Sequence, residues 1–61
     1  MSKPSFAQEQ YAQALIERLR DARLLEAESY ARKVMRCQDR QAMSGLIDEM
    51  KRLVEAVEEE P

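Results

Sequence analysis

The chain has 61 residues and a formal net charge of −2, and it contains one cysteine and no histidine. A single cysteine cannot form a disulfide within the chain. With no histidine and only one thiol, the chain lacks the usual set of nitrogen and sulfur ligands for zinc, so we expect no bound metal and no cofactor. No apolar stretch approaches a membrane span and the first six residues lack the signal-peptide pattern, which predicts a cytoplasmic protein without a membrane partner.

The first predicted helix begins at Ser5, after a flexible arm at residues 1–4. Ser5 is a favourable N-cap, and Gln8 stands three positions later, where a capping box places Gln or Glu. We expect this helix to end at about Arg20. Its apolar residues fall on one face when each residue advances by about 100°: Tyr11, Ala12, Leu15, Leu19 and Ala22.

The second predicted helix runs from about Leu24 to Cys37, because the apolar stripe moves there by about a quarter-turn. No glycine or proline separates the first two helices, so Asp21 is the candidate cap and one continuous helix over 5–37 remains an alternative. Glu28 stands four residues before Arg32, an order that favours an ion pair. The apolar stripe of this segment comprises Leu24, Ala27, Tyr30, Ala31 and Val34.

A third helix is predicted from Arg40, after the polar segment 36–41, with Asp39 as its N-cap. Gly45, the only glycine, falls early in this helix, where it costs about 1 kcal/mol relative to alanine. It indicates either the close approach of another helix or a turn that extends to Gly45. Glutamates at the end of the helix oppose its dipole, so we expect a frayed acidic tail at 59–61.

The third helix also carries an apolar seam with heptad-like spacing over two repeats. A chain this short has little margin for folding alone. We therefore expect an all-α fold, a hairpin or bundle of two or three helices over residues 5–58, completed by homodimerisation through this seam. The predicted dimer interface comprises Met43, Leu46, Ile47, Met50, Leu53, Val54 and Val57.

Charge is unevenly distributed along the chain. Seven basic and four acidic side chains lie between Arg18 and Arg40, whereas two basic and six acidic ones follow Gln41. Arg32, Arg36 and Arg40 are spaced by four with Lys33 alongside, so a continuous helix would align three guanidinium groups toward an acidic protein or toward phosphates. The plainer interpretation is a solvated face paired with Glu28 and Asp39.

No catalytic set is present, because Cys37 has no histidine to activate it and neighbouring acids point to different sides of a helix. The leading hypothesis is therefore a non-enzymatic regulatory or adaptor protein that binds an acidic protein partner and inhibits or positions it. The alternative is a nucleic-acid-binding regulator, which the acids at Asp48 and Glu49 disfavour. The candidate partner-binding residues are Tyr11, Tyr30, Arg32, Lys33, Arg36 and Arg40.

Overall fold

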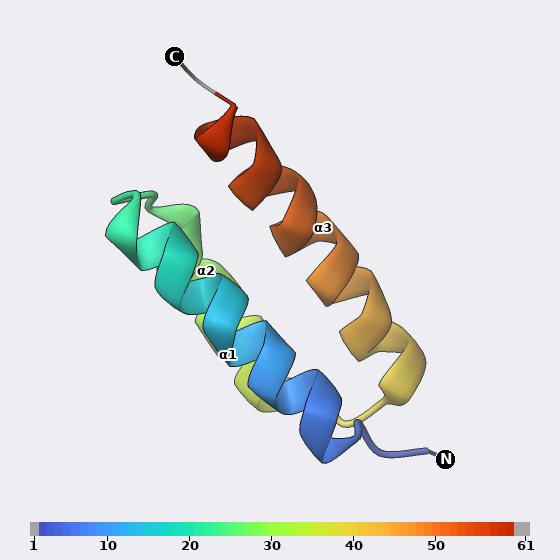
Figure 1. Cartoon of the computed structure of the whole chain (residues 1–61). Coiled ribbons are helices and arrows are strands. Elements are labelled where there is room, and N and C mark those ends of the chain that lie inside the picture. The colour runs from blue at the N-terminus through green and yellow to red at the C-terminus, as the bar shows by residue number, and fades with distance from the viewer. Residues whose placement is uncertain (1, 60–61) are drawn as a thin grey trace.

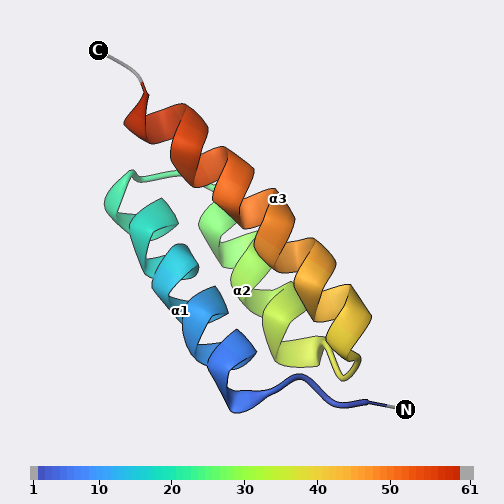
Figure 2. The same ribbon diagram turned by 45° about the vertical axis from the view of Figure 1, so that its right-hand side comes forward.

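The computed structural model describes residues 2–59, and within that range it contains three helices and no strand. These are α1 (Phe6–Asp21), α2 (Glu26–Arg36) and α3 (Arg40–Glu58). α2 runs antiparallel to α1, and α3 returns parallel to α1 and lies against both (Figure 1 and Figure 2). The all-α prediction is confirmed with three helices. The continuous helix over 5–37 is wrong, because the chain reverses direction after Asp21.

The predicted capping box at the start of α1 is confirmed. The hydroxyl of Ser5 accepts from the backbone amide of Gln8, and the side-chain oxygen of Gln8 accepts from the amide of Ser5, both at 3.1 Å. The arm before it contacts α3, because the carbonyl of Ser2 accepts from the amide of Arg40 at 2.9 Å. That amide is one of the donors that the first turn of a helix leaves unpaired. Met1 and the last two residues of the expected acidic tail lie outside the described residues.

The reversal between α1 and α2 is a Schellman turn built around Arg23, which has a φ of 62°. The amide of Arg23 donates to the carbonyl of Arg20 at 2.9 Å, and the amide of Leu24 donates to the carbonyl of Leu19 at 3.1 Å. The expectation that Asp21 caps the second helix is wrong. Asp21 is the last residue of α1, and the N-cap of α2 is Leu25, which makes no side-chain capping bond.

The turn between α2 and α3 follows the prediction closely. The carboxylate of Asp39 accepts from the amide of Ala42 at 3.0 Å, and α3 begins at Arg40. Gly45 is inside α3, so the turn does not extend to it. A Cβ at Gly45 would meet nothing within 4 Å, so no other described part of the chain comes close enough to need a glycine there.

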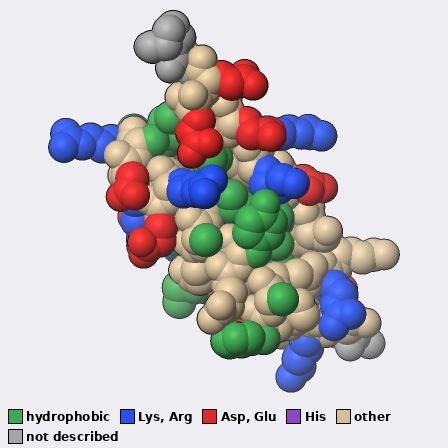
Figure 3. Space-filling view, in the orientation of Figure 1, with side chains coloured by type: hydrophobic (Ala, Val, Ile, Leu, Met, Phe, Trp, Pro, Cys, Tyr) green, Lys and Arg blue, Asp and Glu red, His purple; other side chains and the backbone are tan. Residues whose placement is uncertain are grey.

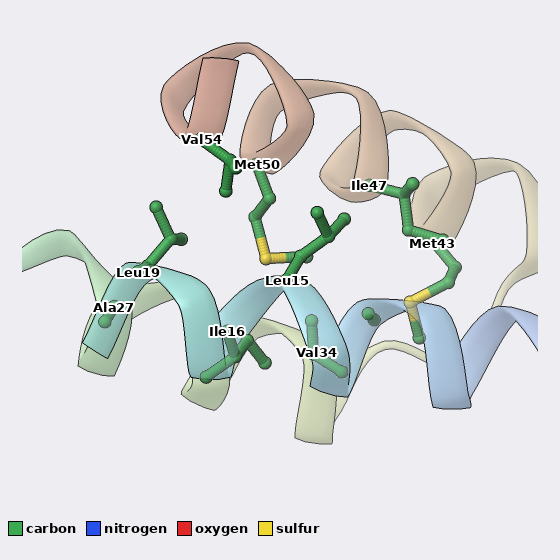
Figure 4. Close-up of a cluster of buried hydrophobic side chains, with 10 residues drawn as sticks. Leu15, Ile16, Leu19, Ala27, Val34, Met43, Ile47, Met50 and Val54 are labelled. Atoms are coloured by element: carbon green, nitrogen blue, oxygen red, sulfur yellow. The ribbon is translucent and has the colours of Figure 1, made fainter. Parts of the chain in front are cut away.

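The core is a single apolar cluster shared by the three helices. Leu15 points from α1 toward α3, where Met50 and Ile47 reach down to it, whereas Ile16 points toward α2 and Val34 (Figure 4). No polar or charged side chain of residues 2–59 is buried. The chain also contains no described helix both long and apolar enough to cross a membrane. The buried residues are Ala12, Leu15, Ile16, Leu19, Ala27, Val34, Met43, Ile47, Met50 and Val54.

Truncating Met50 should destabilise the fold far more than truncating Met35. Met50 is fully buried, whereas Met35 is 80% exposed. We expect Met50→Ala to cost about 2–5 kcal/mol of unfolding free energy, through lost burial and a cavity. Met35→Ala should stay within about 0.5 kcal/mol of the unmodified chain. Urea denaturation followed by circular dichroism measures both, and equal costs would contradict this core.

Replacing Arg23 by glycine should stabilise the protein by about 1 kcal/mol, because glycine adopts a positive φ without the steric cost of a Cβ. The side chain of Arg23 is exposed and belongs to neither ion pair found among residues 2–59. Arg23→Ala keeps the Cβ and serves as the control, with no such gain expected. A lower melting temperature for Arg23→Gly than for Arg23→Ala would show that the turn has another conformation.

Candidate partner-binding surfaces

The basic residues singled out from the sequence are divided between two helices. Arg32, Lys33 and Arg36 are exposed on α2, and we call these three side chains the basic face. Arg40 is the first residue of α3, beyond the turn. The continuous ridge of three arginines therefore does not form, because the helix that carries Arg32 and Arg36 ends at Arg36.

The acids expected to pair with the basic face have other partners. Glu28 accepts two hydrogen bonds from Arg20 on α1, at 3.0 and 3.3 Å, rather than pairing with Arg32. These bonds and the charge of Arg20 lower the pKa of Glu28, and Glu28 in turn raises the pKa of Arg20. The carboxylate of Asp39 caps α3. The basic face thus takes part in no ion pair among residues 2–59.

Tyr30 connects α2 to α3 and is partly buried against the core. Its hydroxyl donates to a carboxylate oxygen of Glu49 at 3.5 Å, and the ammonium of Lys33 lies 5.1 Å from its ring centroid. Burial raises the pKa of Tyr30, and the charge of Glu49 together with this hydrogen bond raises it further. Much of the ring is therefore already engaged by the chain itself, so its predicted role as a partner anchor stays a prediction.

Tyr11 does not lie with the basic face. It is 46% exposed on α1, one turn before Leu15, and Leu15 points toward α3 (Figure 4). Tyr11 therefore belongs to the α1–α3 side of the bundle, whereas Arg32 and Arg36 belong to α2. The structure does not bring the six candidate contact residues together into one patch.

An open groove between α2 and α3 lies next to the basic face, with a volume of about 430 Å³. Leu46 and small side chains of α3 line it, while Lys33, Arg36 and Glu49 supply the charge around it. The sequence analysis missed this groove, because its residues come from two helices whose relative rotation no pattern had fixed. The presence of alanine and glycine three residues apart, at Ala42 and Gly45, was the available signal. The lining comprises Lys33, Arg36, Cys37, Ala42, Gly45, Leu46 and Glu49.

The apolar seam of α3 faces mainly the interior of its own chain. Four of its residues, Met43, Ile47, Met50 and Val54, are buried among α1 and α2. The physical reason is that a heptad-like stripe fits any apolar partner, and here the first two helices provide one. Only the partly exposed members of the seam have surface to offer a second copy, and these are Leu46, Leu53 and Val57.

Apolar side chains outside the groove are also exposed. Phe6, Leu25 and Met35 are the most exposed of these residues. On the face drawn in Figure 3, apolar side chains gather between α1 and α3, and acidic and basic side chains are interspersed above them. No family model, curated protein or solved structure matches this chain. Its function is therefore inferred from the basic face and the groove.

The contact between Tyr30 and Glu49 can be tested by titrating the hydroxyl of Tyr30. Glu49→Gln removes the negative charge, so the pKa of Tyr30 should fall but stay above its ordinary value near 10, because burial remains its largest cause. Tyrosinate absorbance against pH, measured in a Tyr11→Phe background, follows Tyr30 alone. Asp48→Gln removes a neighbouring acid as the control. If the pKa of Tyr30 were equal in the Glu49→Gln variant and its parent, the contact between Glu49 and the Tyr30 hydroxyl would be contradicted.

The same shift sets the direction of the alkaline pH dependence. Because the folded state holds the tyrosine proton more tightly than the unfolded state, this contribution to stability is complete below the unfolded pKa and is lost as pH rises through the folded pKa of Tyr30.

Proposed function

We propose that this chain is a small non-enzymatic regulatory or adaptor protein that binds an acidic surface of a partner protein through the basic face of α2 and inhibits or positions that partner. The observation that carries the proposal is that Arg32, Lys33 and Arg36 stand together on one helix while the nearby acids Glu28 and Asp39 are engaged elsewhere.

Helix geometry supports this use of the basic face. Arg32 and Arg36 are four residues apart, so their guanidinium groups project from successive turns on the same side of α2. Each guanidinium presents planar donors that match a carboxylate in pairs. Because these cations are exposed, their main effect is to steer association and select partners, with affinity supplied by apolar contacts beside them. The α2 side of the α2–α3 groove, with Cys37 and the aliphatic stems of Lys33 and Arg36, offers such contacts.

We also propose that the protein acts as a homodimer and resides in the cytoplasm. Leu46 and Leu53 are only partly covered by their own chain, although both pack against its core. A second copy would cover them and add the burial that a chain of this length supplies sparingly.

Reversing the charge of the basic face tests the binding proposal. Arg32→Glu with Arg36→Glu should abolish the retention of specific proteins from extract of the native cell, measured by affinity capture and mass spectrometry. The exposed Lys51 on α3 and Arg23 in the α1–α2 turn provide a matched pair of charge reversals in Lys51→Glu with Arg23→Glu. The control should retain the same proteins as the unmodified chain. Identical capture by both double variants would contradict the proposal.

Salt titration with duplex DNA and an RNA hairpin tests the alternative of nucleic-acid binding. The proposal predicts no binding at physiological salt by fluorescence anisotropy, because the net charge is negative and Glu49 borders the groove. Binding that falls steeply with salt and disappears in the double variant would instead assign the basic face to phosphates.

A further inference from the structure

One side of α3 is exposed along the length of the helix and has an unusual composition. Five residues at alternating spacings of three and four share this side, and all five are exposed. Half-buried Leu46 and Leu53 flank it and pack against the core that α1 and α2 share with α3. We call this side the outer face of α3; its residues are Ala42, Gly45, Glu49, Arg52 and Ala56.

No contact among residues 2–59 requires a glycine at position 45. Glycine lowers helix propensity relative to alanine, and a Cβ at this position would meet open space. Neither the α3 backbone, which is helical there, nor internal packing calls for a glycine. A backbone without a side chain allows a second helix to approach closely, and here that helix must come from another molecule.

The outer face is complementary to itself when two copies run antiparallel. A two-fold axis that passes midway between Glu49 and Arg52 sets Glu49 of one copy opposite Arg52 of the other. The same axis sets Gly45 opposite Ala56, so a small side chain meets the bare backbone. Each contact occurs twice, as an isologous interface requires. A parallel arrangement would instead face Glu49 with Glu49 and Arg52 with Arg52.

The charges at the ends of α3 favour the same direction. Glu55, Glu58 and Glu59 stand near the end of α3, where their charge opposes the helix dipole, and Glu58 is also 3.7 Å from Arg18 of its own chain. At the start of the helix Arg40 follows Asp39, whose carboxylate caps α3. An antiparallel neighbour brings the acidic end of each α3 to the basic end of the other, near Arg36 and Arg40. The acids that are unfavourable at the end of their own helix are then close to cations of the other copy.

We propose that a second copy of this chain docks antiparallel on the outer face of α3, with Glu49–Arg52 ion pairs across the two-fold axis and Leu53 of each copy reaching Leu46 at the edge of the other copy's α2–α3 groove. This inference deepens the homodimer part of the proposed function and rests on it. It leaves Arg32 of the basic face accessible, because Arg32 does not line the α2–α3 groove, whereas Lys33 and Arg36 line the groove and border the second copy.

Charge exchange at the two-fold axis tests the inference, with sedimentation equilibrium of the full chain as the readout. Glu49→Arg and Arg52→Glu should each weaken dimerisation by about tenfold or more, because each replaces two attractions by two repulsions. The double variant restores both pairs and should dimerise like the unmodified chain. A mixture of the two single variants should form a heterodimer, since each one then faces the opposite charge.

Three further variants isolate the interface from folding effects. Asp48→Arg makes the same charge change one residue away from the outer face and should leave dimerisation unchanged. Tyr30→Phe removes the hydroxyl that contacts Glu49 and should also leave it unchanged. Gly45→Leu should keep its helical circular dichroism, because the site is open in the single chain, and should lose the dimer.

The outcomes separate this interface from the broader proposals. A monomer at hundreds of micromolar overturns both the homodimer and this interface, while partner capture through Arg32 and Arg36 stands or falls separately. A dimer that none of the Glu49, Arg52 and Gly45 variants weakens overturns this interface alone. Weakening by the single variants without restoration in the double variant or in the mixture also overturns it.

Discussion

The structure depends on the burial of one strip of α3 against α1. Three helices in a 61-residue chain enclose a single layer of apolar side chains, and Met43, Met50 and Val54 supply the α3 side of that layer. Because α1 and α3 run parallel, α2 must carry the chain back from the end of α1 to the start of α3. This explains the two tight turns around Arg23 and Asp39. Without this strip the two ends of the chain would have no common core.

Closing the core in this way determines what remains on the surface. The apolar strip of α3 is buried inside the chain, so any contact with other molecules uses the remaining sides of the helices. Arg20 holds Glu28 across the α1–α2 hairpin, and Asp39 caps α3, which leaves the basic face of α2 without an acidic partner among the described residues. The outer face of α3 keeps Gly45 exposed for the same reason. The basic face and the outer face of α3 meet at the α2–α3 groove, and both follow from one packing arrangement.

The sequence predicts local features such as helix caps, but it does not predict how the three helices are placed relative to one another. Ser5 with Gln8 and Asp39 marked two helix starts correctly, because capping depends on residues a few positions apart. The α1–α2 turn was harder, since Arg23 adopts a backbone conformation that usually signals itself by glycine. The apolar seam was recognised, but periodicity shows only that a stripe needs an apolar partner and not whether α1 or a second copy provides it. The α2–α3 groove depends on the rotation of two helices, which no single-helix pattern contains.

The most direct test of this account asks which molecule contacts the methionines of α3. Isotope-filtered NMR on a mixture of labelled and unlabelled chains distinguishes contacts within one chain from contacts between two. The account predicts that the methyl groups of Met43 and Met50 show Overhauser effects to α1 residues such as Leu15 of the same chain only. Effects between the Met50 methyl of one chain and Leu15 of another would contradict it, because the seam would then join two molecules instead of closing one core.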